Sequence, residues 1–416
     1  MKKHQYDVLI IGGGHAGGEV AFRLRQGGFT GSVALLSAEA SLPYHRPPLS
    51  KAFLAGEVAF DSLLLRSVEA YGKAGIAWHP SATVTSIDRV DHLLSLADGS
   101  KLGYGKLIIG TGGRPRTLPL PGVDLGGIHV LRSITDVEDL RPKFLPGKKL
   151  VIVGAGYIGL EVAAVAVKKG LDVEIVEFAS RVLARVAGPE LSAFYERIHT
   201  QEGVKFRFNT GVEGFLAANH DFSRVGAVRC TGGVEVSADI VLVAAGLVPN
   251  VELAKDAGLE LGNGIMVDEY CRTSDPDILA IGDCVEFPLP FLDGKRVRLE
   301  SVPNALEHAR VAASVLNGNP SPYNAVPWFW SDQYNYKLQS VGLSQGYDQV
   351  VVRLPNNPDS YIVFYLKGET AIAADCVNAI SDFSAAKKLV TDRTAIDPAA
   401  LADPTVGLIA ERSSTG

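Results

Sequence analysis

Cysteine is scarce in this chain of 416 residues, and the four cysteines are far apart. None of them, Cys230, Cys271, Cys284 or Cys376, belongs to a CxxC or CxxxxC pair. The sequence therefore offers neither a close pair of thiolate metal ligands nor a vicinal redox disulfide. Such cysteine usage suits a reducing compartment, so we expect a cytoplasmic protein without a metal site.

Long apolar runs and a strong net charge are also missing. No run approaches the roughly 20 apolar residues of a membrane span, and the N-terminus enters a glycine loop without a signal-peptide cleavage site. The formal net charge is −6, from 40 basic and 46 acidic residues, which argues against general nucleic-acid binding. The length, with 47% hydrophobic residues, predicts two or three globular domains.

Glycine, by contrast, is abundant, and its placement near the N-terminus is informative. Gly12, Gly14 and Gly17 follow a predicted strand over residues 7–11 and open a predicted helix over His15–Gln26. A strand, a glycine-rich turn and a helix in this order hold the pyrophosphate of a dinucleotide on the helix N-terminus. The first glycine allows the tight turn, the second lets the phosphates approach, and the third lets the helix pack closely.

A second copy of this pattern strengthens the prediction. Gly154, Gly156 and Gly159 follow a predicted strand over residues 150–153, and the next strand ends at Glu177. A carboxylate there binds the 2′ and 3′ hydroxyls of NAD and repels the 2′-phosphate of NADP. Although Arg181 nearby weakens this preference, the second copy predicts an NADH site, and two copies predict two nucleotide sites.

The first copy lacks an acid at the corresponding place. Its second predicted strand, Val33–Leu36, is followed by Ser37 and Ala38, and Glu39 comes one residue later. Either Glu39 binds the ribose, or Ser37 does so with help from the backbone.

Two loops carry charges that suit a cofactor. LPYHRPPLSK, residues 42–51, is stiffened by its proline pair, and its cations Arg46 and Lys51 either face a cofactor or are solvated on a rigid surface loop. GTGGRP, residues 110–115, follows a predicted strand and suits a backbone that crosses close to a cofactor. The prolines that follow it mark a domain exit.

Asp283 ends a predicted buried strand beside Gly282. This position suits an acid that holds a polyol chain, although an aspartate there also serves as a helix N-cap. After Gly318 the composition changes, and short strand-like runs with one helix predict a small α+β domain. Trp328 and Trp330 belong either to the core of this domain or to a site. The polar residues after Trp330 favour a site for that tryptophan, whereas Trp328 fits either role.

We therefore predict three domains. The first comprises residues 1–114 and 240–320, the second residues 115–239, and the third residues 321–416. The motifs GGGHAG, LPYHRPPLSK, GTGGRP, GAGYIGLEVAA, GLVPN, IGDCVEFP and PWFWSDQY occur in this order. By these motifs, over nearly its whole length, the chain resembles the FAD-containing NADH:ferredoxin reductases that serve bacterial cytochrome P450 and Rieske-type oxygenase systems.

The resemblance implies an α/β fold with two Rossmann-like dinucleotide-binding domains, arranged as in glutathione reductase, plus the small α+β domain. It implies that the first fold binds FAD and the second binds NADH. The residues expected to contact FAD are Gly12, Gly14, Gly17, Glu39, Arg46, Lys51, Thr111, Gly112, Arg114, Asp283, Val302 and Trp330. Those expected to contact NADH are Gly154, Gly156, Tyr157, Ile158, Gly159 and Glu177. Many relatives carry an acid at Ala38, so the adenosine ribose contact passes to Glu39.

Two residues are implied to be catalytic. Glu161 matches a glutamate near the nicotinamide that pairs with the lysine of the PPLSK loop, here Lys51. Lys51 would favour negative charge on the flavin. Trp330 matches a tryptophan at the flavin edge that faces the iron–sulfur partner. The implied reaction passes hydride from NADH to FAD and then single electrons to a [2Fe–2S] ferredoxin.

The partner is expected to be this ferredoxin, with no nucleic acid or membrane, and the protein to be a monomer or weak dimer. Because such ferredoxins are commonly acidic, local basic residues should steer docking. The candidates are Arg296, Arg298, Arg310 and Lys337.

Three alternative functions use similar folds or cofactors. A disulfide reductase or cysteine-dependent peroxidase needs a redox cysteine soon after the second strand, and none occurs before Cys230, which excludes it. A flavoprotein of the apoptosis-inducing-factor kind is disfavoured because long insertions and a transit peptide are missing. A reductase of rubredoxin or another carrier stays open.

Overall fold

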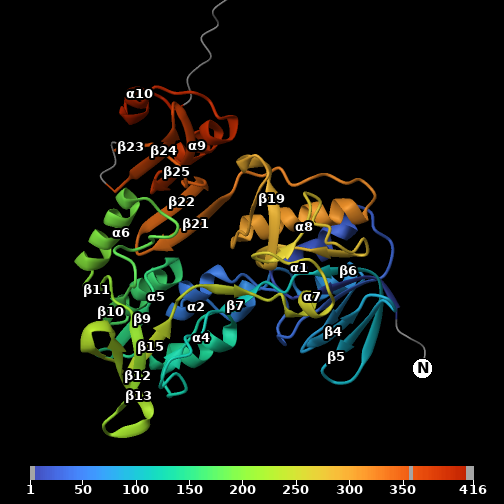
Figure 1. Cartoon of the computed structure of the whole chain (residues 1–416), viewed down its shortest axis with the longest axis horizontal. Helices are drawn as coiled ribbons and strands as arrows, with labels where there is room; N and C mark the ends of the chain where they lie inside the picture. The colour runs from blue at the N-terminus through green and yellow to red at the C-terminus, as the bar shows by residue number, and fades with distance from the viewer. Residues whose placement is uncertain (1–4, 356–358, 409–416) are drawn as a thin grey trace, which may run out of the picture. The chain divides into compact units, whose positions relative to one another are not determined.

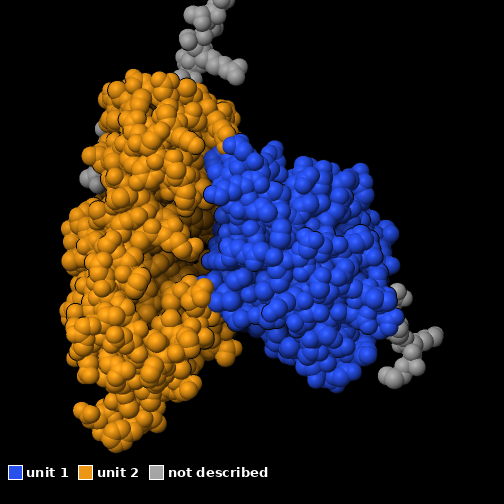
Figure 2. All heavy atoms as spheres, viewed as in Figure 1, with its two compact units in different colours: residues 1–46, 60–114, 247–325 blue, residues 47–59, 115–246, 326–416 orange. Residues whose placement is uncertain are grey.

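The computed structural model describes residues 5–355 and 359–408 (Figure 1). The chain divides into two compact units (Figure 2). Unit 1 comprises residues 1–46, 60–114 and 247–325, and unit 2 comprises residues 47–59, 115–246 and 326–416. None of the helices in the described ranges is both long and apolar enough to cross a membrane.

Unit 1 is built on a seven-stranded sheet with the order β3-β2-β1-β6-β5-β4, and β18 pairs with β6. Its strands are β1 (Gln5–Ile11), β2 (Val33–Leu36), β3 (Ile76–His79), β4 (Val84–Asp88), β5 (Leu93–Leu96), β6 (Lys101–Ile109) and β18 (Ile278–Ala280). β1 runs parallel to β2 and β6, so Ile11 lies opposite both Leu36 and Ile109. The carboxyl ends of these strands therefore meet at one edge, where the glycine turns begin.

Helices and a second small sheet complete unit 1. α1 (His15–Gln26) packs against α8 (Val302–Leu316), and β17, β19 and β20 form a three-stranded sheet. The other elements are η2 (Phe60–Leu63), α3 (Val68–Lys73), β7 (Gly113–Pro115), β16 (Leu247–Pro249), α7 (Glu252–Asp256), β17 (Ile265–Met266), η5 (Gly282–Cys284), β19 (Val285–Leu289), η6 (Pro290–Leu292) and β20 (Lys295–Val297).

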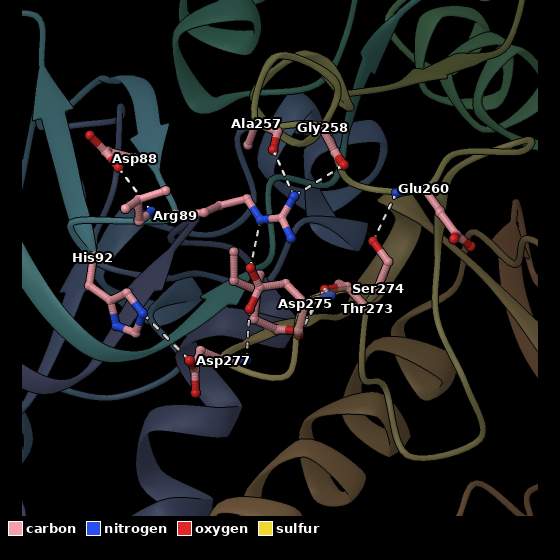
Figure 3. Close-up of polar contacts among 12 residues, drawn as sticks. Asp88, Arg89, His92, Ala257, Gly258, Glu260, Thr273, Ser274, Asp275 and Asp277 are labelled. Atoms are coloured by element: carbon pink, nitrogen blue, oxygen red, sulfur yellow. Dashed lines mark hydrogen bonds and ion pairs between the residues drawn. The ribbon is translucent and has the colours of Figure 1, made fainter.

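Arg89 fastens the end of β4 to the rest of unit 1 (Figure 3). Its Nε donates to the Asp275 carboxylate at 2.6 Å, and its Nη1 donates to the carbonyls of Ala257 and Gly258 at 3.2 Å. Asp275 also accepts the backbone N–H of Asp277. The cluster has these internal partners, which indicates a structural role.

Unit 2 contains a parallel sheet with the order β11-β10-β9-β15-β8 and a three-stranded antiparallel sheet. The parallel strands are β8 (Ile128–His129), β9 (Lys149–Val153), β10 (Asp172–Val176), β11 (Lys205–Arg207) and β15 (Ile240–Val243); the antiparallel ones are β12 (Val212–Ala218), β13 (Asp221–Cys230) and β14 (Val234–Ser237). The helical elements are η1 (Pro47–Ser50), α2 (Ala52–Ala55), α4 (Ile134–Leu140), η3 (Arg141–Lys143), α5 (Tyr157–Lys168), α6 (Pro189–Gln201) and η4 (Thr231–Gly233).

The C-terminal part of unit 2 is an antiparallel sheet with the order β21-β22-β25-β24-β23. Its elements are β21 (Trp328–Gln333), β22 (Tyr336–Gly342), β23 (Gln349–Arg353), β24 (Tyr361–Lys367), β25 (Thr370–Val377), α9 (Ile380–Asp392) and α10 (Pro398–Ala402). β21 packs against α5. The predicted α/β class, with two dinucleotide folds and a small α+β domain, is confirmed.

The predicted boundary at residue 240 is wrong. β15 pairs with β9 and β8, so it completes the second parallel sheet, and the chain returns to unit 1 only at Leu247. Both parallel sheets use fully buried apolar strands, so the run in β15 does not reveal to which sheet it belongs. Residues 47–59 also belong to unit 2, although their neighbours in sequence belong to unit 1.

Candidate functional site

The first glycine turn has the geometry that a bound pyrophosphate requires. Gly12 has φ +114°, and a Cβ on it would lie 2.1 Å from the carbonyl oxygen of Gly110. A Cβ on Gly17 would lie 1.9 Å from the oxygen of Gly12, whereas one on Gly14 would meet no heavy atom within 4 Å. α1 starts after Gly14 without a side-chain cap or an acid in its first turn. Its N–H groups and the open space therefore suit a phosphate.

The second glycine turn repeats this geometry. Gly154 has φ +108°, and a Cβ on it would lie 2.6 Å from the oxygen of Ala244. A Cβ on Gly159 would lie 2.3 Å from the oxygen of Gly154, and one on Gly156 would meet nothing within 4 Å. α5 also begins without a side-chain cap or a first-turn acid. The chain therefore has two turns that each fit a dinucleotide.

Glu177 lies at the edge of the second turn. Its two carboxylate oxygens accept the backbone N–H groups of Ala155 and Ala179, each at 2.7 Å. Arg181 donates to the carbonyl of Ala187 and the hydroxyl of Ser192, so it is engaged within its own loop. The Glu177 carboxylate therefore lies next to the turn. A carboxylate there can accept hydrogen bonds from the ribose diol of NAD, whereas it would repel the 2′-phosphate of NADP.

Near the first turn, Ser37 and Glu39 have different surroundings. Ser37 is buried, and its Oγ accepts the N–H of Glu39 at 3.1 Å. The Glu39 carboxylate accepts the Tyr44 hydroxyl at 2.6 Å and an Arg46 nitrogen at 2.5 Å. Of the two candidates for the adenosine ribose, Glu39 is the half-exposed one.

Arg46 joins two of the residues expected at the FAD site. The pKa of its guanidinium is raised above the ordinary value: burial lowers it, but the Tyr44 hydroxyl and the carboxylates of Glu39 and Asp283 raise it more. Asp283 lies in η5, directly after β18. The structure therefore brings Glu39, Arg46 and Asp283 into one electrostatic group in unit 1.

The GTGGRP turn is held by Asn250. The Thr111 hydroxyl donates to the Asn250 carbonyl at 2.7 Å, and Arg114 donates to the Asn250 side chain at 2.7 Å. Gly112 has φ +62°, and its carbonyl accepts the Asn250 N–H. Arg114 also forms a half-exposed ion pair with Glu252. Sequence reasoning missed Asn250, although the GLVPN motif that contains it was visible.

Two further expected FAD residues occupy regular elements. Val302 is the first residue of α8, which is capped by Ser301. Trp330 lies in β21 opposite Gln339 and is half-buried. Its ring lies 5.7 Å from that of Trp328, which also contacts Phe383 of α9. Trp328 is partly buried between Trp330 and Phe383.

Lys51 and Glu161 form an ion pair in which Glu161 is buried and Lys51 is partly exposed. The Lys51 Nζ lies 2.6 Å from the Glu161 carboxylate, which is 3% exposed. Lys51 also donates to the carbonyl of Pro47. Glu161 accepts two hydroxyls as well, from Ser50 at 2.5 Å and Ser331 at 2.6 Å. The expected pair is thus present, and its two serine partners were missed by sequence reasoning.

The first two residues of α5, Tyr157 and Ile158, differ in their exposure to solvent. Ile158 is 44% exposed. The Tyr157 hydroxyl is buried, and among the described residues it has no hydrogen-bond partner. Burial raises its pKa, as do nearby Asp375, Tyr195 and Tyr365. Only the backbone and ring of Tyr157 therefore remain for a contact with NADH.

Most of the basic residues proposed for docking are engaged elsewhere. Arg296 donates to two backbone carbonyls, Arg298 pairs with Glu300, and Arg310 pairs with Glu307. These three arginines have partners within unit 1, and their part in docking stays a prediction. Lys337 is exposed on β22.

The cysteines cannot act as redox pairs. All four thiols are free and buried, and burial raises the pKa of each. Their thiolate forms are therefore disfavoured, which agrees with the exclusion of a disulfide reductase.

Comparisons with known proteins agree with this geometry. The family described as pyridine nucleotide-disulphide oxidoreductase matches residues 6–309, and that described as reductase C-terminal matches residues 328–410. Putidaredoxin reductase CamA of Pseudomonas putida is 44% identical over 405 residues, which cover 97% of this chain and 96% of that protein. The ferredoxin reductase subunit of a 5,5'-dehydrodivanillate O-demethylase from Sphingobium is 46% identical over 398 residues, covering 96% of each.

A solved structure extends the likeness to three dimensions. The reductase in the crystal structure of the covalent putidaredoxin reductase–putidaredoxin complex matches with a TM-score of 0.93 and 43% identity, covering 97% of each chain. The resemblance stated from the motifs is confirmed. The chain belongs to the pyridine nucleotide-disulphide oxidoreductase family and is a ferredoxin reductase within it.

Proposed function

We propose that this protein takes hydride from NADH onto FAD and passes the electrons singly to a [2Fe–2S] ferredoxin that serves a cytochrome P450 or a Rieske-type oxygenase. The observation that carries the proposal is the pair of open glycine turns in one chain, at Gly14 and Gly156. Two dinucleotide sites without a reactive thiol suit a flavoprotein that draws electrons from a nicotinamide nucleotide. FAD, when bound, supplies the conversion from a two-electron to a one-electron carrier.

The chain's residues would bind and orient the cofactors. Unit 1 holds FAD at the first glycine turn, with Glu39 toward the adenosine ribose and Arg46 and Asp283 toward the rest of the molecule. Unit 2 holds NADH at the second turn, with Glu177 on the ribose diol. Lys51, fixed by Glu161, favours negative charge on the flavin.

The partner follows from the relatives. A relative with 43% identity is known in a covalent complex with putidaredoxin, which supports a small electron carrier as partner here. We propose that Trp330 and the exposed Lys337 belong to its docking face. We further propose that the protein is cytoplasmic, as its free cysteines suggest, and is a monomer or weak dimer.

The direct test measures NADH-dependent reduction of cytochrome c by the purified protein, with and without added [2Fe–2S] ferredoxin. We expect bound FAD and rapid reduction only when the ferredoxin is present. A protein without flavin, or a rate that ferredoxin does not change, would contradict the proposal. A rate higher with rubredoxin than with any [2Fe–2S] ferredoxin would assign the rubredoxin alternative.

A substitution tests the role of Lys51. Lys51→Met should slow flavin reduction by NADH by about tenfold or more while FAD stays bound, as measured by stopped-flow absorbance. Lys205→Met is a matched control, because Lys205 pairs with Asp172 on the exposed edge of the second sheet. A wild-type rate in Lys51→Met would remove Lys51 from the mechanism.

A further inference from the structure

Glu161 receives three hydrogen-bond donors, and one of them comes from the C-terminal sheet. Ser50 and Lys51 bind its Oε2, whereas the Oγ of Ser331, in β21, binds its Oε1 at 2.6 Å. The carboxylate is 3% exposed and Ser331 is fully buried. Water therefore does not replace Ser331 if the hydroxyl is removed.

The contacts continue beyond Ser331 as a chain of side chains within unit 2. The Gln333 amide nitrogen donates to the Ser331 Oγ at 3.2 Å. The Gln333 amide oxygen lies 2.8 Å from His199 Nε2, and the Tyr334 hydroxyl lies 3.1 Å from His199 Nδ1. Gln333 and His199 are buried, and Tyr334 is partly exposed.

The Ser331 hydroxyl donates its single proton to Glu161, so its oxygen accepts from the Gln333 nitrogen, and the other directions follow from this pair of bonds. Because Gln333 donates through its nitrogen, its oxygen accepts, so His199 carries a proton on Nε2. Burial lowers the pKa of His199 to about 4, so the ring is neutral near pH 7 and its Nδ1 accepts from Tyr334. Each group thus donates toward Glu161.

Hydrogen bonds that point the same way polarise one another, most strongly in a buried environment. Their combined dipoles stabilise the negative charge at the end of the chain. Here that end is the carboxylate that pairs with Lys51. Loss of any member should therefore weaken the hold on Glu161, with less effect as the distance grows.

We propose that Ser331, Gln333, His199 and Tyr334 form a positioning chain that keeps the Glu161 carboxylate oriented, and thereby holds Lys51 in place for hydride transfer. This inference rests on the proposed function. It extends the machinery for flavin reduction to α6, which contains His199, and to the hairpin of β21 and β22, which contains the other three residues.

The first test compares two buried serines. Ser331→Ala should lower the rate constant of flavin reduction at saturating NADH about tenfold, with an apparent Kd for NADH within about twofold of wild type. Ser331→Thr, which keeps the hydroxyl, should restore most of the rate. Ser340→Ala is the matched control, because the Ser340 hydroxyl also donates to a buried carboxylate, that of Asp375. Equal rates in Ser331→Ala and Ser340→Ala would overturn the inference.

A second pair of variants removes single hydroxyl groups and keeps both aromatic rings. Tyr334→Phe removes only the terminal hydroxyl of the chain, and Tyr336→Phe, on the same hairpin, removes a hydroxyl outside it. We expect Tyr334→Phe to slow flavin reduction by about twofold and Tyr336→Phe to have no effect. Identical behaviour of the two would show that the chain ends before Tyr334 and contradict the proposal.

A spectroscopic readout needs no catalysis. In protein labelled with ¹⁵N-histidine, His199 should give the signals of a neutral ring protonated on Nε2, and they should not titrate between pH 6 and 8. His199→Phe assigns the signals. A ring protonated on Nδ1, or one that titrates in this range, would refute the direction of the chain.

The outcomes separate this inference from the function on which it rests. If NADH fails to reduce the flavin of the wild-type protein, the proposed function is wrong. If wild type is reduced rapidly and Ser331→Ala behaves like wild type, only the positioning chain is wrong.

Discussion

The turn at Gly12 and the turn at Gly154 have the same backbone conformation, but the acidic residues near them differ. In both, the second glycine faces open space and the third packs against the first. After the second turn, Glu177 is held by two backbone N–H groups. Near the first, Glu39 is held by Tyr44 and Arg46 instead. The glycines thus provide a phosphate site in either case, and the side chains beyond them decide which dinucleotide is held.

The largest effect should come from a charge placed in each turn. Asp is a good N-cap, so Gly14→Asp and Gly156→Asp should leave the fold intact while the carboxylate repels a pyrophosphate. We expect Gly156→Asp to weaken NADH binding at least about 100-fold and to retain FAD. Gly14→Asp should weaken FAD binding to a similar degree and leave the affinity for NADH unchanged. Flavin absorbance and NADH titration measure both. If one variant lost both FAD and NADH binding, the assignment of one cofactor to each turn would be contradicted.

The third glycines should differ in their effect on stability. A Cβ approaches backbone oxygen more closely at Gly17, at 1.9 Å, than at Gly159, at 2.3 Å. Gly17→Ala should lower the free energy of unfolding by about 2–3 kcal/mol, and Gly159→Ala by somewhat less, in denaturant titrations. Gly72→Ala, on α3, has no heavy atom near its Cβ and should not destabilise. The opposite order would mean that the turns relax differently.

Tyr157, the first residue of α5 after the second turn, interacts electrostatically with the buried acid Asp375. Burial raises the pKa of Asp375 to about 6, against hydroxyl bonds from Ser340 and Tyr365 that lower it. The folded state therefore binds more protons than the unfolded state between about pH 4 and 6, and this group makes stability fall as the pH rises through that window. Asp375→Asn should raise the free energy of unfolding by roughly 2 kcal/mol at pH 8. Near pH 4 the substitution should leave the free energy of unfolding unchanged. No gain at pH 8, measured by denaturant titration, would contradict the raised pKa.

The smallest effects are expected from substitution of the two acids, Glu177 and Glu39. Glu177→Gln should lower kcat/KM for NADH about tenfold and narrow the preference over NADPH, with FAD content unchanged. Glu39→Gln should weaken FAD binding by a similar factor and leave the affinity for NADH unchanged. Equal kcat/KM for NADH and NADPH in the wild-type enzyme would contradict the role given to Glu177.

Local sequence patterns were sufficient for the elements that carry the glycine turns. The strand and helix around Gly12, including His15–Gln26, were predicted close to their observed bounds because glycine spacing and apolar periodicity are encoded within a few residues. The boundary at residue 240 was wrong because strand pairing depends on a distant partner. The Lys51–Glu161 pair came only from the family resemblance, since no local pattern joins residues so far apart in sequence.

Ser331 and Asn250 show what local patterns cannot reveal. Each binds a residue of the expected sites from a segment far away in sequence. A serine in a strand or an asparagine after a proline is common, so neither has a signal of its own. Only the folded arrangement identifies them.

The membership of residues 47–59 in unit 2 limits how this enzyme can be cut into fragments. A fragment that spans only residues 115–246 contains the whole second parallel sheet, yet it lacks Ser50 and Lys51, as well as Ser331. Glu161 would then lose all three of its donors. An isolated NADH-binding fragment should therefore be expressed with Glu161 replaced by an apolar residue, or else joined to the two short segments that the chain supplies from elsewhere.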